Sequence, residues 1–429
     1  MLKKITLTLN FTLLFFSVFA QVGIGTLNPD ESSILDLVSS DKGVLMPRMT
    51  TAERESINNP ADGLYIYDTD ESRFFFFSEK NSGWEKVGTQ NDIESRENPG
   101  KSTGKVKNVI FMIGDGMGPA QIQAAFTTNF DHLNMTTFPY TGIVRTYSAD
   151  AKTTDSAASA TAMSCGVKTK NGYLGLDPNG NRLTSIITNA KRNGLSTGIV
   201  VTQTVTHATP AAFYAFQTDR YNYTAIAADF ALSNTVDVCI GGGKQYFNAT
   251  DISNLIYNNY NVVYNLNDVT SDKDKVVALL ADDGMPTVWG GRGEMLSVAT
   301  AKALDILKKN DKGFFLMIEG SYIDSGGHSK DVNYAIRELL DFDRAVSVAK
   351  SFAEADGNTL VIVTADHETG GLIVYGKENM ETYYTNKLDG KHTCVPVFSF
   401  AYGPGGENFV GFFDNIDFKP RMEKLLNFQ

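Results

Sequence analysis

Cysteine is scarce in this chain of 429 residues. Its three cysteines, Cys165, Cys239 and Cys394, are odd in number and lack the spacing of a metal-binding motif. This excludes a disulfide-rich scaffold, in which several bridges replace a large core. One pair could still form a disulfide, and the sequence alone leaves that open. With 42% hydrophobic residues, the chain is long enough for a large core to provide its stability.

Positive charge is in deficit. Lys and Arg number 38 against 49 Asp and Glu, which gives a formal net charge of −11. Because nucleic-acid backbones are bound by clustered Lys and Arg, this balance argues against a nucleic-acid-binding surface. An anionic substrate would need a local positive site. Bound divalent metal ions could provide one without entering the side-chain count.

Long apolar runs are missing except at the amino terminus. Residues 1–20 begin with Lys3 and Lys4, continue with a largely apolar stretch and end in Val-Phe-Ala20, which predicts a signal peptide cleaved near Ala20. A membrane-spanning helix is the alternative, but the stretch is short and contains Thr and Asn. We therefore expect no membrane span and a periplasmic or secreted protein.

Residues 21–88 differ from the rest of the chain. Turn-forming Asn-Pro, Asp-Lys-Gly and Ala-Asp-Gly separate short apolar or alternating runs, which predicts a small β-rich module. Through Val22-Gly-Ile-Gly-Thr and Gly43-Val-Leu-Met-Pro-Arg-Met it resembles amino-terminal modules of exported Bacteroidetes proteins, and it is a candidate for binding a partner of unknown kind. Residues 89–106 are polar, with Asn-Pro-Gly and Ser-Thr-Gly, and predict a linker.

Residues 107–429 have the pattern of one larger domain. Continuous apolar runs near 109–113, 195–201, 314–318 and 360–363 alternate with helical stretches. Such continuous runs are typical of strands buried on both faces. The sequence therefore predicts an α/β domain with a mostly parallel central sheet flanked by helices. Sheets of this kind bind ligands outside the carboxyl ends of their strands.

Acidic and histidine side chains follow the first and last of these runs. Asp115 stands in Gly-Asp-Gly after the first run, and Asp366 and His367 follow the last. A lone Asp in a turn more often bonds to the backbone. Adjacent Asp and His at the end of a core strand, however, offer an oxygen and a nitrogen ligand to a metal ion.

Another run leads into Glu319, Asp324 and His328. The Asp and the His are four residues apart, so one helical turn would place both on the same face, whereas Glu319 could serve a neighbouring metal. An accidental surface arrangement is plausible for any one of these motifs and less so for all three. Of the five histidines, only His132 falls outside segments rich in candidate ligands or turns, and we interpret it as a surface or structural residue.

Ser156 stands at the start of a predicted helix rich in small residues, in Thr153-Thr-Asp-Ser-Ala-Ala-Ser-Ala-Thr-Ala. Taken alone, this is best explained as an ordinary helix start with capping side chains. A serine at this place is also suited to holding a phosphoryl group, because the free amides and the helix dipole favour anions.

Taken together and in this order, these motifs resemble the alkaline phosphatases over residues 107 to about 428. The resemblance implies hydrolysis of small phosphate monoesters through a phosphoserine at Ser156, with Arg220 holding the phosphate. It also implies two zinc ions, one magnesium ion and a possible homodimer. The implied ligands are Asp324, His328 and His392 for one zinc, Asp115, Asp366 and His367 for the other, and Asp115, Thr209 and Glu319 for magnesium.

Some features depart from the family pattern. His207 stands where some bacterial members carry Asp and many animal and marine bacterial members carry His, which links it to the third metal site and leaves magnesium or zinc open there. Ser325 stands where better-known members carry Lys, His or Trp, which predicts weaker inhibition by phosphate. Residues 242–293 could hold a variable lid, in which Trp289-Gly-Gly-Arg-Gly either borders the pocket or only turns the chain.

Two other functions are open. A phosphodiesterase or sulfatase of the same superfamily would share the metal scaffold, although Thr209 and Glu319 together indicate the third metal site typical of monoesterases. The amino-terminal module also suggests a surface adhesion or assembly protein. That function would require lost chemistry, and every residue that the resemblance implies for the site is present.

Overall fold

The computed structural model describes residues 22–26, 35–41, 43–78, 83–86, 105–376, 380–385, 387 and 389–428. The predicted signal peptide and most of the predicted linker lie outside these residues. The chain divides into two units, Met1–Ile93 and Glu94–Gln429.

The first unit contains short strands, as its turn pattern predicts. β1 (Val22–Ile24) and β2 (Leu35–Leu37) form a parallel pair, and a four-stranded sheet contains β3 (Arg48–Met49), β4 (Tyr65–Asp68), β5 (Arg73–Ser78) and β6 (Gly83–Lys86). Helix α1 (Thr51–Glu55) precedes β4. The buried Arg54 guanidinium binds Asp68 at 2.9 Å and lies 4.1 Å over the Phe75 ring, so polar and cation–π contacts join this helix to the sheet.

The second unit is centred on a ten-stranded sheet with the order β11-β12-β10-β9-β13-β7-β14-β19-β8-β20. Among its strands only β19 runs against its neighbours, which confirms the prediction of a mostly parallel sheet. Every residue of β7, β13 and β14 is buried, as their continuous apolar runs predict. The strands are β7 (Asn108–Gly114), β8 (Tyr140–Arg145), β9 (Ser196–Thr204), β10 (Val238–Gly242), β11 (Asn261–Val263), β12 (Val276–Leu279), β13 (Phe314–Gly320), β14 (Thr359–Thr364), β19 (Val397–Tyr402) and β20 (Gly411–Asp414).

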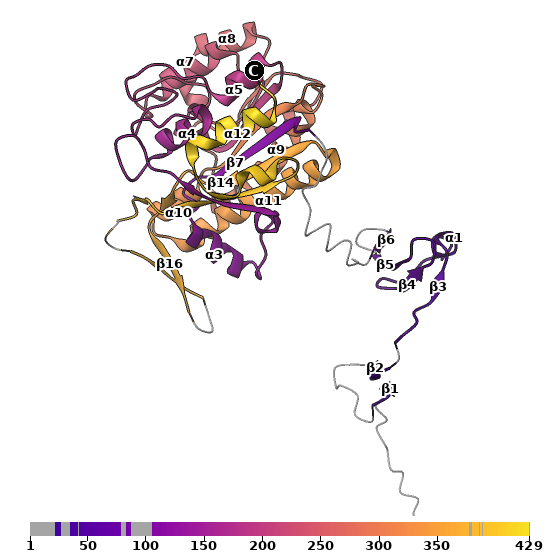
Figure 1. Ribbon diagram of the computed structural model, residues 1–429. Coiled ribbons are helices and arrows are strands. Elements are labelled where there is room, and N and C mark those ends of the chain that lie inside the picture. The colour runs from indigo at the N-terminus through magenta and orange to yellow at the C-terminus, as the bar shows by residue number, and fades with distance from the viewer. Residues whose placement is uncertain are drawn as a thin grey trace, which may run out of the picture. The chain divides into compact units, whose positions relative to one another are not determined.

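Helices cover both faces of this sheet (Figure 1). One face carries α3 (Pro119–Thr128), α9 (Met295–Leu307), α10 (Ile323–His328) and α11 (Val332–Asp356). The other carries α4 (Ser156–Cys165), α5 (Ile186–Arg192), α6 (Ala208–Ala211) and α12 (Phe418–Leu425), while α7 (Tyr223–Ser233) packs against α8 (Ala249–Tyr257). Among the described residues, no helix has the length and apolar composition needed to cross a membrane.

Residues 242–293, which could hold a variable lid, contribute two short strands to the sheet. β11 and β12 lie in this interval and extend the main sheet beyond β10. Trp289 is exposed, whereas the Arg292 side chain is buried and binds Glu338 and Asp341 on α11. The ion pairs of Arg292 therefore connect the Trp289-Gly-Gly-Arg-Gly turn to α11. The three cysteines, whose pairing the sequence left open, are all free.

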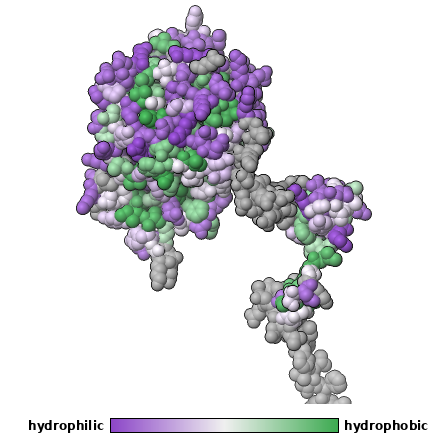
Figure 2. Space-filling model, viewed as in Figure 1, coloured by the Kyte–Doolittle hydropathy of each residue, from purple (hydrophilic) through white to green (hydrophobic). Residues whose placement is uncertain are grey.

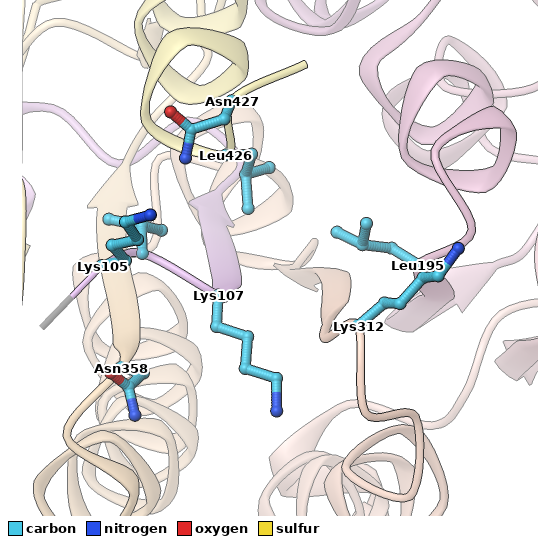
Figure 3. Close-up of a pocket in the computed structure, with 8 residues that line it drawn as sticks. Lys105, Lys107, Leu195, Lys312, Asn358, Leu426 and Asn427 are labelled. Carbon is cyan, nitrogen blue, oxygen red and sulfur yellow. The ribbon is translucent and has the colours of Figure 1, made fainter.

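One pocket of about 320 Å³ lies at the amino ends of the central strands. Its lining includes Lys107, Leu195, Lys312 and Asn358, which lie one or two residues before the starts of β7, β9, β13 and β14, respectively. In Figure 3 the amino groups of Lys107, Lys312 and Lys105 point in different directions. They therefore do not converge on one bound anion.

Candidate metal and phosphate site

The candidate ligands lie at the carboxyl ends of the central strands of the sheet. Asp115 directly follows β7, Glu319 is the penultimate residue of β13, and Asp366 lies two residues beyond β14. These three strands are adjacent and parallel, with Glu319 in register with Ile113. Their carboxyl ends must therefore meet, which explains why side chains about 250 residues apart lie together.

The first cluster contains Asp324, His328 and His392, whose potential ligand atoms lie within 4.8 Å of one another. Helix α10 carries Asp324 and His328 on one turn, with 3.1 Å between Oδ2 and Nε2, as the spacing of four predicts. Nε2 of His392 lies 3.2 Å from Nε2 of His328 and 3.5 Å from Asp324 Oδ1.

Backbone carbonyls orient both histidines of this cluster. Nδ1 of His328 lies 2.7 Å from the Gly390 carbonyl oxygen, and Nδ1 of His392 lies 3.0 Å from that of Thr154. A proton on each Nδ1 satisfies these carbonyls and leaves each Nε2 with a lone pair. This is the second contact that metal-binding histidines usually make.

The second cluster contains Asp115, Asp366 and His367, all fully buried. His367 Nε2 lies 3.1 Å from Asp366 Oδ2 and 3.7 Å from Asp115 Oδ1. The other oxygen of Asp366 accepts hydrogen bonds from the amides of Gly116 and His367 at 3.0 and 2.9 Å, so Oδ2 is the oxygen that remains for the cluster.

Asp115 also belongs to a third cluster with His207 and Glu319. His207 precedes α6, and Thr209 lies inside it, so the end of β9 brings both toward β13. The Thr209 hydroxyl faces the Glu319 carboxylate and partly offsets the effect of burial on the pKa of that group. The implied set of Asp115, Thr209 and Glu319 is thus brought together, and His207 joins it.

The donor atoms of the second and third clusters fit metal ions. In these two clusters and Thr209, seven buried atoms have no hydrogen-bond partner of good geometry among the described residues: both oxygens of Asp115, both of Glu319, Asp366 Oδ2, Thr209 Oγ1 and His207 Nδ1. Buried carboxylates without a partner cost several kcal/mol, unless a cation compensates their charge. Oxygen-rich ligands suit Mg²⁺, while the mixed nitrogen and oxygen sets of the other clusters suit Zn²⁺.

The pKa values of these groups reflect burial of like charges. Burial, with the charge of Asp366 and other nearby carboxylates, raises the pKa of Asp115 well above its ordinary value. Burial also raises the pKa of Glu319 to about 8. His207, in the same cluster, shifts in the opposite direction: burial and the Arg220 charge lower its pKa to about 3. Its imidazole is therefore neutral and able to bind a metal ion.

Ser156 lies beside these clusters at the first position of α4. Its Oγ is buried, 3.3 Å from His367 Nε2 and 3.4 Å from Arg220 Nη2. Asp155 caps the helix by accepting a hydrogen bond from the Ala158 amide at 2.9 Å. The helix amino terminus and the guanidinium thus face the same hydroxyl, which is an arrangement that attracts an anion.

Sequence reasoning missed several supporting residues. Asp155 was seen only as a cap, yet its Oδ2 also binds Arg220 Nη1 at 3.1 Å. Thr369 donates to Asp324 Oδ1 at 2.5 Å and lies 3.2 Å from His367 Nδ1, so it connects two clusters. Gly116 has a φ of +72°, and a Cβ there would lie 2.6 Å from Asp324 Cα. The second glycine of Gly-Asp-Gly could have indicated this close approach, because glycine is favoured where φ is positive or another backbone lies near.

A pocket of about 480 Å³ opens next to the first cluster. The described residues that line it are Thr153, Thr154, Asp155, Asn171, His328, Lys387, Asp389, Lys391 and His392. It lies at the carboxyl side of the sheet, opposite the pocket of Figure 3. His132, in contrast, is exposed and belongs to none of the clusters formed by the described residues.

These features define the class: an α/β domain with a candidate metal centre and a serine–arginine pair suited to phosphate. A family model of the alkaline phosphatases matches residues 106–391. The chain therefore belongs to the alkaline phosphatase family. A separate family model, described as a phage tail like trimerisation region, matches residues 23–102.

Individual relatives agree with this family. Alkaline phosphatase 4 of Bacillus subtilis is 40% identical over 291 residues, and the match spans 63% of this chain and 63% of that protein, less than two thirds of its length. Alkaline phosphatase of Escherichia coli is 33% identical over 410 residues, covering 75% of this chain and 86% of that protein. The solved alkaline phosphatase of the Antarctic bacterium TAB5 is 38% identical with a TM-score of 0.72, covering 76% of this chain and 99% of that one.

Proposed function

We propose that the protein hydrolyses phosphate monoesters to an alcohol and inorganic phosphate, through a phosphoserine at Ser156, at a site for two zinc ions and one magnesium ion. The observation that carries this proposal is the position of Ser156 Oγ, 3.4 Å from Arg220 Nη2 and 3.3 Å from His367 Nε2. A nucleophile, an anion-binding group and a metal-type cluster thus meet at one atom. Family membership supports the same reaction.

Two displacements at phosphorus complete this reaction. Ser156 Oγ gives up its hydroxyl proton and attacks the phosphorus, the bond to the alcohol oxygen breaks, and the alcohol takes up a proton. Water then attacks the phosphorus of the phosphoserine from the opposite side and loses a proton, and the bond to Oγ breaks as Oγ regains one. Throughout, the planar guanidinium of Arg220 binds phosphate oxygens, and Asp155 holds that guanidinium through Nη1 at 3.1 Å. When bound, the metal ions would supply Lewis-acid stabilisation of the entering and leaving oxygens.

The third cluster favours a monoesterase over a phosphodiesterase or sulfatase. Asp115, His207, Glu319 and Thr209 provide more ligands than two zinc ions need. His207 is relevant to which metal ion the third cluster binds. The alkaline phosphatase of TAB5 has been solved as a His-to-Asp mutant with magnesium bound in the M3 site. We propose by analogy that His207 shifts the third site of this chain away from a strict preference for magnesium.

The first test is hydrolysis of p-nitrophenyl phosphate against bis-p-nitrophenyl phosphate, with and without chelator and added zinc and magnesium. We expect strong monoester preference that chelation abolishes. Ser156→Ala should lose at least about a thousandfold in kcat, because the nucleophile is absent. Ser297→Ala, which alters a half-buried serine of α9, is the matched control. Preference for the diester would instead indicate a phosphodiesterase, and inactivity with both metals restored would favour a binding protein.

We propose that the enzyme is exported and cleaved near Ala20, leaving residues 21–88 as an amino-terminal module and 107–429 as the catalytic domain. The basic start and apolar stretch of residues 1–20 support this. Amino-terminal sequencing of protein recovered outside the cytoplasm tests the cleavage. A chain that retains residue 1 there would contradict it.

We further propose that the module joins three copies of the chain. The match to a trimerisation region supports this stoichiometry. Exposed apolar residues of the module, including Ile24, Leu35 and Leu45, support it as well. Figure 2 shows apolar surface among the described residues of this module. The homodimer implied by family resemblance stays an alternative prediction. Light scattering during gel filtration separates them: three chains support the module's role, two support the dimer, and one contradicts both.

A further inference from the structure

We propose that Lys387 and Lys391 select phosphate monoesters whose alcohol carries a second negative charge, such as a carboxylate or another phosphate. This inference rests on the proposed function and names its substrate class. Both lysines are exposed and line the 480 Å³ pocket beside the first metal-type cluster.

The position of Ser156 determines where the alcohol must lie. Ser156 is 1% exposed, so the phosphoryl group must approach its Oγ from the side on which a pocket opens. The pocket is lined by the residues directly before Ser156 and by His328 and His392. In an in-line displacement the leaving alcohol is opposite the attacking oxygen. It therefore extends outward toward this pocket.

The charges of the pocket do not cancel. Its two carboxylates already have cationic partners outside the lining, because Asp155 binds Arg220 and Asp389 binds Lys330, each at 3.1 Å. Within the described residues, no carboxylate forms an ion pair with Lys387 or Lys391. Among the described residues, these two positive charges at the border of the site have no carboxylate partner, in a protein with a net charge of −11.

Lys391 is held close to the site by its backbone. Its carbonyl oxygen accepts a hydrogen bond from the Gly370 amide at 2.9 Å, and the preceding Gly390 carbonyl lies 2.7 Å from His328 Nδ1. The following residue is His392, a member of the first cluster. The lysine backbone is therefore fixed while the long side chain can follow different alcohols. Ser325, next to Asp324 on α10, adds no charge of its own.

The test compares two esters of one carbon skeleton, 3-phosphoglycerate and glycerol 3-phosphate, which differ by a carboxylate. Substitutions Lys387→Gln and Lys391→Gln are made singly and together in the full mature chain loaded with zinc and magnesium. Lys312→Gln is the matched control, since it removes an exposed lysine from the pocket at the opposite edge of the sheet. Binding of 3-phosphonopropionate against propylphosphonate, measured by calorimetry, gives a readout without turnover.

We expect the wild type to prefer 3-phosphoglycerate in kcat/KM, and each single substitution to lower that preference about threefold, as typical for an exposed charge pair. The preference should also fall as added salt shortens the screening length from about 30 Å to about 3 Å. A preference unchanged in the double variant, or absent from a wild type that hydrolyses both esters, would refute this inference alone. Hydrolysis of neither ester would refute the proposed function as well.

Discussion

Asp155 binds the guanidinium of Arg220 at 3.1 Å while it caps the helix that begins at Ser156. One carboxylate therefore sets both the direction of the helix amino terminus and the orientation of the anion-binding arginine. Its Oδ1 accepts from the Ala158 amide and its Oδ2 from the Gly172 amide and Arg220. The nucleophile and the phosphate-binding group are thereby fixed relative to each other.

Replacing Asp155 with Asn should separate these two roles. Asn is as good a helix cap as Asp, but its amide nitrogen cannot accept from Arg220. We expect kcat/KM for p-nitrophenyl phosphate to fall about 10- to 100-fold, which corresponds to the loss of about 1.5–3 kcal/mol from a charged hydrogen bond. The melting temperature should fall modestly, because the Gly172 amide also loses its acceptor oxygen. Asp331→Asn, which alters the cap of α11, is the control. Equal losses of activity in both variants would contradict the role of the pair.

The same pair shows what the sequence could predict and what it could not. Asp115 and Asp366 were identified because each follows an apolar run, and parallel strands bring their carboxyl ends together. Asp155 and Arg220 are 65 residues apart and come from different loops, so no periodicity relates them. The strands β11 and β12, within residues 242–293, could not be predicted because they are short, with three and four residues.

His207→Asp tests the third cluster. The half-buried imidazole offers a nitrogen ligand, whereas Asp would add a third carboxylate beside Asp115 and Glu319, and magnesium prefers oxygen. We expect the variant to retain more magnesium than the wild type after dialysis, measured by elemental analysis of the protein. His132→Asp, at an exposed position, adds the same charge and should not change the metal content. Unchanged magnesium in His207→Asp would place the third ion elsewhere.

Ser325→Lys should strengthen inhibition by inorganic phosphate. The new ammonium group would extend from α10 beside Asp324 and His328, where bound phosphate is expected. An exposed or half-buried attraction of this kind lowers the inhibition constant about two- to fivefold. Ser351→Lys, on the exposed surface of α11, carries the same added charge away from the site. An inhibition constant equal to that of the wild type would contradict the prediction.

Removal of the metal ions should make stability depend on pH through Glu319. Burial raises the pKa of this carboxyl from 4.5 to about 8, so the folded, metal-free protein holds the proton more tightly than the unfolded chain. Its contribution to folding is therefore fully present below pH 4.5 and is lost as the pH rises toward 8. Glu319→Gln keeps the neutral form at every pH.

We expect chelated wild type and chelated Glu319→Gln to melt at similar temperatures near pH 4.5, and the wild type to melt at progressively lower temperature than the variant up to about pH 8. Calorimetry across this range measures the melting temperatures of both proteins. Because both contain the same four histidines in the clusters, the difference between the two melting temperatures removes the effect of histidine titration. Glu407→Gln, at an exposed position, should show no such trend. Zinc and magnesium should reverse the order at pH 8, because the bound cations stabilise the ionised carboxylate that Gln lacks. A constant difference across the whole range would mean that Glu319 is ionised even without metal.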